Sequence, residues 1–570
     1  MTEQGQAVAT IPSDRHVGVR IDVQALTRTV KTKDRRELKV LDAASFSVAP
    51  GELVAIVGGS GAGKTTLLEA MAGVTPATSG CVRFDGADLY SNLRTFRTVL
   101  GYVPQDDIIH VDLPLEHTLR YAARLRLPPS ASARDVHAAV AEAMAAVDLT
   151  SHADTRVASL SGGQRKRASI AVELLTSPHV FFLDEPTSGL DPVTSAEVVA
   201  RLHHLANRGT TVVFTTHSIE DLTACDRIVF MAQGGRVGFV GSLDHAREHF
   251  HVDTVTELYG RLANLEPSAV TAGSAVVPPD SGGTEPGVAR RAPPGAVRQW
   301  AVLTRRTLET LVRNRLTLAI LVGSPALVVG MFAVLFRPGA FDFRDPSPSS
   351  MVMVGFWVVF AAFFFGLTYG LLQICTERTI LRREHLVGLR LGPYVASKVT
   401  VLAPFLALVV VAMLGVLRLL DRLPARPFST YLSIGVTLLL CALAALGLGL
   451  LASAAVGNVA QATLALPMLC FPAVLFSGAI LPVHLMAGAG AVISLAIPSR
   501  WAFEAVGHDL GARHILAAGG SPLGPPLLAS YGDAGTSSIG VYWAILIAFA
   551  VVFLVGTWLV LVRTTRRATR

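Results

Sequence analysis

Charged residues are scarce in this sequence. Asp, Glu, Lys and Arg together make up 16% of its 570 residues, whereas a soluble globular protein has about a quarter. Cysteine is scarcer still: the chain has five cysteines and no CxxC pair, which argues against both a disulfide framework and a zinc site. Residues 1–20 contain no apolar run, so we expect no cleaved signal peptide and a cytoplasmic first domain.

Positive charge exceeds negative charge, and the net charge is +7. A basic excess can indicate nucleic-acid binding, but much of it here is arginine beside apolar segments, such as Arg305, Arg306, Arg313 and Arg563. Cytoplasmic flanks of membrane helices carry positive charge in this way, so we expect no nucleic-acid partner. Apolar residues make up 51% of the chain, and the long apolar runs all follow residue 315. The sequence therefore predicts a membrane-embedded C-terminal half.

The N-terminal part has the patterning of a globular domain. Residues 1–265 alternate short β-rich runs with helical patterns, which is typical of an α/β domain with a mostly parallel sheet. The runs at residues 52–57, 180–184 and 210–217 are predicted to form buried strands.

Two segments are predicted to join this domain to the membrane. Residues 266–295 are dominated by Pro, Gly, Ser and Ala without periodicity, which predicts a flexible linker. Residues 296–315 have an amphipathic helical pattern with several basic residues, so we expect a connecting helix along the cytoplasmic membrane surface. The transmembrane domain then occupies residues 316–570.

Six apolar segments of that domain are each close to the roughly 20 residues that an α-helix needs to span a bilayer. Six spans return the C-terminus to the cytoplasm, in agreement with four arginines in the last eight residues. Residues 481–505 are apolar but interrupted by Gly and Pro, which favours a re-entrant hairpin over a seventh span. No span centre carries an ionisable residue, which argues against an ion-coupled carrier. The predicted spans are Leu316–Phe336, Met351–Ile374, Val399–Leu417, Thr430–Ala452, Gln461–Ile480 and Gly540–Val562.

A glycine-rich loop lies between a predicted strand and a predicted helix, and it satisfies the pattern G-x-x-x-x-G-K-[ST]. Its glycines let backbone N–H groups converge on phosphate oxygens, Lys64 neutralises the β- and γ-phosphates, and Thr65 offers a hydroxyl to Mg²⁺. The alternative, a glycine-rich turn without a ligand, does not account for the Lys-Thr pair in register. The motif predicts ATP and Mg²⁺ as ligands and Gly58, Gly59, Ser60, Gly61, Ala62, Gly63, Lys64, Thr65 and Thr66 as the ATP-binding residues.

Two acidic residues end the second predicted strand. Ligands bind at the carboxyl ends of parallel strands, so we expect Asp184 to hold Mg²⁺ and Glu185 to polarise the attacking water. His217 ends the last predicted strand, where its imidazole can reach a γ-phosphate. Gln105 is a further candidate for contact with Mg²⁺ or the water. The residues alone leave open a solvated acidic pair and a purely structural histidine.

A second phosphate-binding pattern lies about a hundred residues after the first. Leu160, Ser161, Gly162, Gly163 and Gln164 open a helix with a hydroxyl cap and two glycines, which can satisfy the first amides or leave them for an anion. An ordinary capped helix is the alternative. The glycine loop, LSGGQ, LDEPTSGLD and the strand-final histidine, in this order, resemble the nucleotide-binding domain of ABC transporters.

The resemblance implies an α/β P-loop ABC ATPase domain followed by an all-α six-helix transmembrane domain. In that family the LSGGQ helix closes on the ATP of a second nucleotide-binding domain, so each site is shared between two domains. A single nucleotide domain with six spans implies a half-transporter, most simply a homodimer, with a heterodimer as the alternative. The D-loop of the family corresponds to Ser188, Gly189, Leu190 and Asp191.

The domain order is similar to that of the ABC G subfamily and its bacterial relatives, which export lipids, sterols and hydrophobic drugs. The loop after the second span resembles the family's coupling segment, in which Glu384 is expected to act, with its short helix pressing on the Gln105 loop. Gln164 in place of a frequent Glu and the lack of external cysteines favour a bacterial plasma-membrane protein over a eukaryotic one.

The second and fifth spans line the central cavity in this subfamily, which makes six residues candidates for substrate contact. Packing or lipid-facing aromatics, and polar residues that face headgroups, are the alternatives. We expect ATP-driven export of a hydrophobic or amphiphilic substrate; an importer and a non-transporting membrane ATPase regulator remain alternatives. The cavity candidates are Phe356, Phe360, Phe363, Phe364, Asn458 and Gln461.

Overall fold

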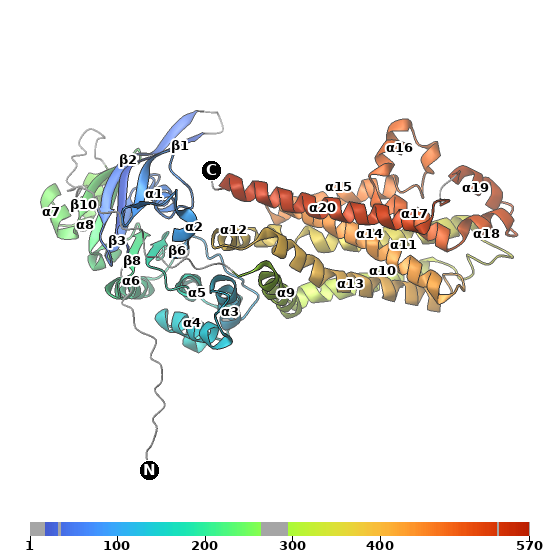
Figure 1. The fold of residues 1–570 in the computed structure, drawn as a ribbon, viewed down its shortest axis with the longest axis horizontal. Helices are drawn as coiled ribbons and strands as arrows, with labels where there is room; N and C mark the ends of the chain where they lie inside the picture. Colours follow the sequence, from blue (N-terminus) through green and yellow to red (C-terminus); the bar gives the residue numbers. More distant parts are fainter. Residues whose placement is uncertain (1–17, 32–35, 98, 264–293, 533–534, 569–570) are drawn as a thin grey trace, which may run out of the picture. The chain divides into compact units, whose positions relative to one another are not determined.

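The computed structural model describes residues 18–31, 36–97, 99–263, 294–532 and 535–568. The chain divides into two units, with the main boundary between Pro294 and Gly295, and each unit is described by itself (Figure 1). The predicted linker at residues 266–295 lies almost entirely outside the described residues.

The first unit contains two β-sheets. An antiparallel sheet has the order β2-β1-β4-β5, and a second, mainly parallel sheet has the order β10-β9-β3-β8-β7-β6. The strands are β1 (Ile21–Lys31), β2 (Glu37–Val48), β3 (Leu53–Gly58), β4 (Ser79–Phe84), β5 (Ala87–Asp88), β6 (Leu100–Val103), β7 (Val180–Leu183), β8 (Thr211–Thr215), β9 (Arg227–Ala232) and β10 (Arg236–Gly241).

The centre of the parallel sheet is fully buried. Every residue of β7 and β8, and every residue of β3 except its last, is buried, as expected for parallel strands covered on both faces. The three predicted strands are therefore present within two residues of their expected bounds. The prediction that the third of them is the last strand was wrong, because β9 and β10 follow it as an antiparallel pair. That pair turns at Gly234 and Gly235, which both have positive φ.

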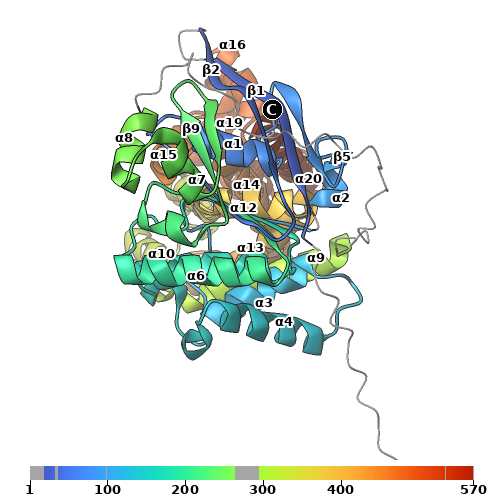
Figure 2. The same ribbon diagram turned by 90° about the vertical axis from the view of Figure 1, so that its left-hand side faces the viewer.

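Helices cover this sheet (Figure 2), and the helices that follow β6 and precede β7 in the sequence form a separate group. In that group, the buried Arg126 of α3 makes two hydrogen bonds, of 2.7 and 2.9 Å, to the Glu173 carboxylate of α5. The helices are α1 (Lys64–Met71), α2 (Leu93–Phe96), α3 (Leu115–Arg126), α4 (Ala133–Ala146), α5 (Gly162–Leu174), α6 (Pro192–Asn207), α7 (Leu243–Phe250) and α8 (Val255–Ala263), with the short 3₁₀ helices η1 (Thr150–His152), η2 (Val157–Ser159) and η3 (Glu220–Ala224).

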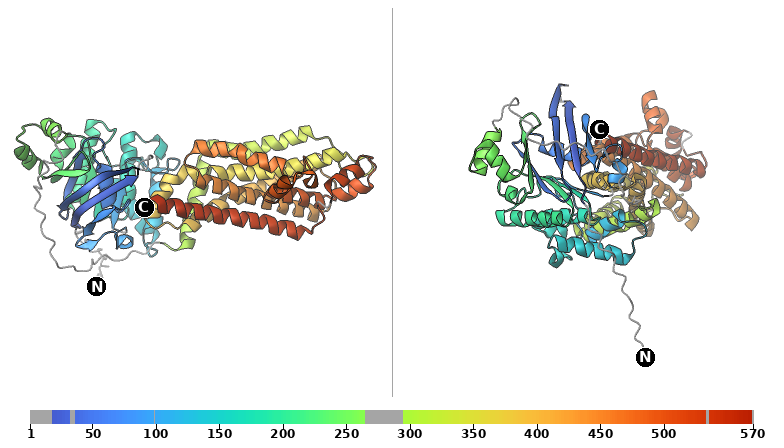
Figure 3. Two further views of the ribbon diagram at one scale, coloured as in Figure 1. Left: turned by 90° about the horizontal axis from the view of Figure 1, so that it is seen from above. Right: turned by 60° about the vertical axis from the view of Figure 1, so that its left-hand side comes forward.

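The regular secondary structure in the described residues of the second unit is all helical, and the long helices run side by side (Figure 3). It consists of α9 (Ala296–Arg313), α10 (Arg315–Leu335), α11 (Pro348–Leu371), η4 (Cys375–Glu377), α12 (Arg378–Leu386), α13 (Leu391–Leu419), α14 (Phe428–Ala455), α15 (Val459–Leu475), η5 (Val483–Leu485), α16 (Gly488–Leu495), α17 (Pro498–Asp509), α18 (Ala512–Ala518), α19 (Gly524–Tyr531) and α20 (Ile539–Ala568).

Five helical segments of this unit are long and apolar enough to cross a membrane, and they correspond to five of the six predicted spans. The fifth predicted span, 461–480, is shorter than expected, because α15 ends at Leu475 and has 17 residues. At 1.5 Å per residue it is about 26 Å long, slightly less than the hydrocarbon core. Phe476 caps the end of α15, and two residues later Gly478 adopts a left-handed conformation with φ of 81°.

Small residues allow α11 and α14 to pack closely. A Cβ atom at Gly366 would lie 2.1 Å from the carbonyl oxygen of Ala442, and one at Gly449 would lie 2.4 Å from that of Leu367. Close approach at small residues is a common mode of helix packing in membranes. Residues 481–505 form η5, α16 and most of α17 in place of one continuous helix; their depth in a membrane stays a prediction.

Candidate nucleotide site

The glycine loop connects β3 to α1, and three of its glycines, Gly58, Gly61 and Gly63, have positive φ values that favour glycine. Gly58 and Gly63 have φ values of 153° and 93°, and a Cβ atom at either would lie within 2.7 Å of a carbonyl oxygen. In contrast, a Cβ atom at Gly59 or Gly61 would meet no atom within 4 Å. The loop therefore leaves open space on the side where a phosphate would approach its N–H groups.

Lys64 and Thr65 begin α1 directly after this loop. The Lys64 ammonium donates hydrogen bonds to the carbonyls of Gly58 (2.9 Å) and Gly59 (3.1 Å), which places its charge over the loop. The Thr65 hydroxyl donates to Asp184 Oδ1 at 3.1 Å. Of the other predicted loop residues, Ser60 is exposed, Ala62 is buried and Thr66 is half-buried.

Asp184 and Glu185 follow β7, and a neighbouring threonine holds both. Thr215, the last residue of β8, donates from its hydroxyl to Asp184 Oδ1 at 2.6 Å and accepts from the Glu185 backbone N–H at 2.8 Å. Glu185 has a φ of 44°, an uncommon value for a residue other than glycine. Thr215 was not among the predicted site residues. The strand register could have identified it: Leu183 of β7 pairs with Phe214 of β8, so the next residues, Asp184 and Thr215, lie side by side.

Thr215 gives a prediction for stability. Changing Thr215 to Val keeps the shape of the side chain but leaves the Asp184 carboxylate and the Glu185 N–H without this partner. We expect the free energy of unfolding to fall by about 1–3 kcal/mol, because these polar groups are buried or half-buried. The apparent melting temperature of the detergent-purified protein should fall, whereas Thr223→Val at an exposed position should leave it nearly unchanged. Equal melting temperatures for the two variants would contradict this role.

Gln105 and His217 both lie beside the Glu185 carboxylate. Gln105 Nε2 donates to Glu185 Oε2 at 3.1 Å, and His217 Nδ1 lies 3.7 Å from the same oxygen. Gln105 follows β6 and His217 follows β8, and β6, β7 and β8 are neighbours in the sheet. The carboxyl ends of these parallel strands thus bring together the four side chains predicted from the sequence, Gln105, Asp184, Glu185 and His217.

The LSGGQ segment forms a capped helix start. The Ser161 hydroxyl accepts from the Gln164 backbone N–H at 3.3 Å, and the Gln164 side chain accepts from the Ser161 N–H at 3.0 Å. This reciprocal cap is the ordinary one that the sequence left open. Leu160 is buried, whereas Gly162 is exposed and a Cβ atom there would meet nothing within 4 Å. Within the described residues, no hydrogen bond joins residues 160–164 to the glycine loop.

The predicted D-loop connects Glu185 to α6. Asp191 caps α6 by accepting from the Thr194 N–H and hydroxyl, at 3.0 and 2.6 Å, and these hydrogen bonds lower the pKa of the Asp191 carboxyl. Ser188 donates its N–H to the carbonyl of Glu185, and Gly189 has a φ of 75°. Leu190 is close to Gly163, since a Cβ atom there would lie 3.4 Å from Leu190 Cδ2.

Asp221 is a further residue that sequence reasoning missed. Its carboxylate accepts hydrogen bonds from the hydroxyls of Thr187 (2.7 Å), Thr216 (2.7 Å) and Ser195 (3.1 Å). It therefore ties the start of the D-loop to the residue that precedes His217.

The predicted residues of the second unit have local partners. Glu384 is buried and forms an ion pair with Arg306 of α9. Asn458 caps α15 by accepting from the Gln461 N–H at 2.9 Å, and Gln461 accepts from the Gly457 N–H at 2.8 Å.

The four predicted aromatic residues of α11 do not share one environment. Phe356 and Phe363 are 2% and 1% exposed, so they pack inside the helical unit. Phe360 and Phe364 are half-buried, with ring centroids 6.1 Å apart. Of the four, only Phe360 and Phe364 are partly exposed in the described part of the chain.

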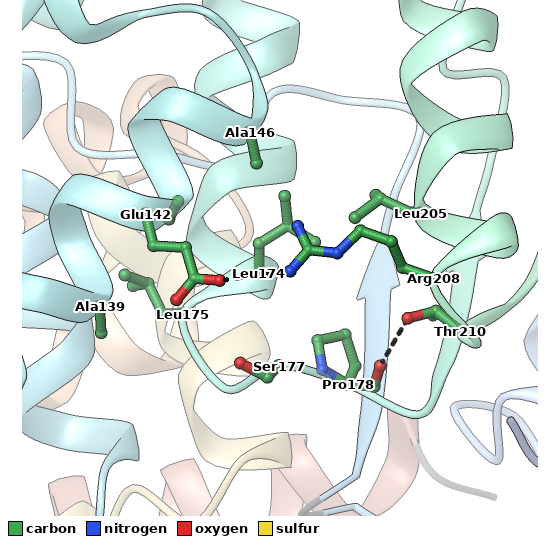
Figure 4. A pocket seen from close by; sticks show the side chains of 11 residues that line it. Ala139, Glu142, Ala146, Leu174, Leu175, Ser177, Pro178, Leu205, Arg208 and Thr210 are labelled. Carbon is green, nitrogen blue, oxygen red and sulfur yellow. Dashed lines mark hydrogen bonds and ion pairs between the residues drawn. The ribbon is translucent and has the colours of Figure 1, made fainter. Parts of the chain in front are cut away.

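A hollow in the first unit lies apart from these residues (Figure 4). It lies between α4, α5 and α6, with Glu142 and Arg208 on opposite sides. Neither the glycine loop nor Glu185 lines it. The hollow is therefore not the nucleotide site.

Comparison with known proteins agrees with this architecture. Residues 41–188 match the ABC transporter family and residues 298–508 match the ABC-2 type transporter family. The ABC transporter ATP-binding/permease protein Rv1747 of Mycobacterium tuberculosis is 33% identical over 85% of this chain and 57% of its own length. ABC transporter G family member 22 of Arabidopsis thaliana is 34% identical over 43% of this chain and 33% of its own length. The chain thus spans little more than half of the first relative.

Among solved structures, the dimeric structure of MJ0796, a bacterial ABC transporter cassette, has 26% identity and a TM-score of 0.37, covering 39% of this chain and 98% of that chain. The apolar helices and the ABC-2 type match make the protein a multi-pass membrane protein. The chain belongs to the ABC transporters, with an ATP-binding ABC ATPase domain followed by a membrane domain of the ABC-2 type.

Proposed function

We propose that this chain is one half of an ATP-driven exporter of hydrophobic or amphiphilic molecules in a bacterial plasma membrane. Two chains form the transporter, most simply as a homodimer, with the N-terminal domains and the C-termini in the cytoplasm. The observation that carries the proposal is the cluster at the ends of β6, β7 and β8, where Gln105, Asp184, Glu185 and His217 gather beside a glycine loop.

The residues beside the loop fit a magnesium ion. Thr65 supplies a hydroxyl oxygen and Asp184 a carboxylate oxygen, and these atoms lie 3.1 Å apart. Mg²⁺ prefers such hard oxygen ligands and binds through one or two protein groups together with substrate phosphates and water. When bound, Mg²⁺ neutralises charge on the phosphates.

Glu185 is the group that we assign to the hydrolytic water. Its carboxylate accepts the proton of a water that attacks the γ-phosphate, while the Gln105 amide and the His217 imidazole orient the carboxylate and the water. The fixed backbone at Glu185, held by Thr215, supports this assignment because a general base must be positioned before its proton affinity matters.

The LSGGQ segment is assigned to the ATP of the partner chain. Gly162 has neither a positive φ nor a neighbour within 4 Å of its missing Cβ, so nothing in its own chain requires glycine there. Close approach of an external phosphate to the helix start accounts for it.

For the substrate, we assign the half-buried face of α11 that carries Trp357, Phe360 and Phe364. This apolar face suits a hydrophobic or amphiphilic molecule. Glu384, held by Arg306, keeps α12 in place on α9, which suits a coupling element that must transmit force without bending.

Transport is tested in inside-out membrane vesicles that contain the purified protein and a fluorescent phospholipid analogue. We expect ATP-dependent movement of the analogue to the lumenal leaflet, since the nucleotide domain faces outward in such vesicles. Vesicles with Glu185→Gln protein are the matched control. Movement in the opposite direction would favour an importer, and ATP hydrolysis that moves none of a panel of amphiphiles would favour a regulator.

A further inference from the structure

Lys166 is a buried lysine in the helix that begins with LSGGQ. It is 4% exposed, and its ammonium donates to the carbonyl of Gln105 at 2.7 Å and to that of Pro104 at 3.3 Å. A buried ammonium is costly unless its hydrogen bonds are satisfied, so these two carbonyls fix where the side chain lies. Burial lowers the pKa of Lys166, and the carboxylates of Asp107 and Asp184 oppose that shift.

The neighbouring basic residues have different partners. Arg165 donates to the carbonyl of Leu160 at 3.2 Å, and Arg167 lies 3.9 Å from Asp148 and 3.8 Å from Glu197. Of these three consecutive cations, Lys166 is the one with hydrogen bonds to the Gln105 segment.

These contacts connect two groups that belong to different ATP sites in the proposed dimer. The start of α5, at Ser161 and Gly162, is assigned to the partner's ATP. The Gln105 side chain donates to Glu185, which is assigned to the chain's own ATP. Between them lie one turn of a rigid helix, the Lys166 ammonium and the Gln105 backbone.

We infer that Lys166 is a positioning residue that couples the two ATP sites of the dimer. When the partner's ATP engages the start of α5, the helix shifts Lys166, and Lys166 in turn shifts the Gln105 segment against Glu185. The inference rests on the proposed function, because it requires a dimeric ATPase with shared sites. Packed and hydrogen-bonded groups that connect two sites can carry energetic coupling between them.

A double-mutant cycle between Gly162→Ala and Lys166→Met tests this coupling on the full-length protein. The Gly162→Ala change adds a Cβ that meets no atom of its own chain within 4 Å, so its effect on turnover reports contact with the partner's ATP. If Lys166 couples the two sites, Gly162→Ala should lower the ATPase rate about tenfold in the parent protein. In protein that already carries Lys166→Met, the same change should lower the rate less than about threefold. Equal factors in both backgrounds would overturn the inference.

Control variants and the activity of the parent protein separate the possible causes of failure. Arg134→Met removes a cation from an exposed position of α4 and should leave the effect of Gly162→Ala at its parental value. Lys166→Arg keeps a charged donor and should restore the parental factor. If Lys166→Met lowers the melting temperature so far that the protein does not purify, the same cycle is run with Lys166→Gln, which is too short to reach both carbonyls and should likewise reduce the factor below about threefold. A parent protein without ATPase activity would contradict the proposed function itself, whereas an active parent with equal factors contradicts the coupling alone.

Discussion

Replacing Glu185 by glutamine should lower ATP hydrolysis by about 10²–10⁴-fold, the usual contribution of a general base. Glutamine has the size of glutamate and can still accept the hydrogen bond from Gln105 Nε2, so the surrounding structure should persist. It cannot take a proton from water. Lys64, Thr65 and Asp184 are untouched, so ATP binding should remain within a few-fold of the parent. Phosphate release and binding of a fluorescent ATP analogue measure the two quantities separately.

The matched control for this variant is Glu220→Gln. Glu220 is an exposed glutamate of the same domain and accepts a hydrogen bond from Ser218. We expect the control to hydrolyse ATP at nearly the parental rate. Hydrolysis by Glu185→Gln protein at the parental rate would remove Glu185 from the reaction and leave His217 or Gln105 to be examined for that role.

The motifs could be predicted from the sequence because each depends on residues close together along the chain. The glycine loop needs one strand, one turn and one helix start, and the structure has β3, residues 58–63 and α1 in that order. The contacts of Thr215 could not be predicted in the same way. They depend on β8 lying beside β7 with Leu183 opposite Phe214, and local sequence patterns do not predict which strands are neighbours in a sheet.

The membrane unit shows a related limit. Apolar length predicted six spans, and five helical segments meet the expected length. Hydropathy could not predict that α15 would end at Leu475, because residues 476–480 are themselves apolar or small and the helix ends at a backbone turn. Helical spacing also could not predict that the Phe356 side chain is buried whereas that of Phe360 is half-buried. Both lie on one apolar helix, and the neighbours of α11 decide which of them is buried.

Sharing of each ATP site between two chains predicts an asymmetric result in mixed dimers. One variant, Lys64→Ala, damages the loop that binds ATP. The other, Gly162→Asp, places a negative charge at the helix start assigned to the partner's ATP, and its Cβ would meet no atom of its own chain within 4 Å. Each homodimer then has two damaged sites and should hydrolyse ATP at a small fraction of the parental rate.

A dimer of one Lys64→Ala chain with one Gly162→Asp chain should regain activity. If sites are shared, both changes fall in one site and the other site has an intact loop and an intact LSGGQ helix. The control carries both changes on one chain, paired with a parental chain, so that each site contains one damaged element. The two dimers have identical composition and differ only in arrangement, and purification through two different affinity tags isolates each. We expect phosphate release from the first dimer to exceed that from the second about tenfold, which corresponds to about 1.4 kcal/mol lost at each damaged site of the second dimer. Equal rates would contradict shared sites. A faster control dimer would place each complete site within a single chain, because then the control dimer would contain one undamaged site and the first dimer none.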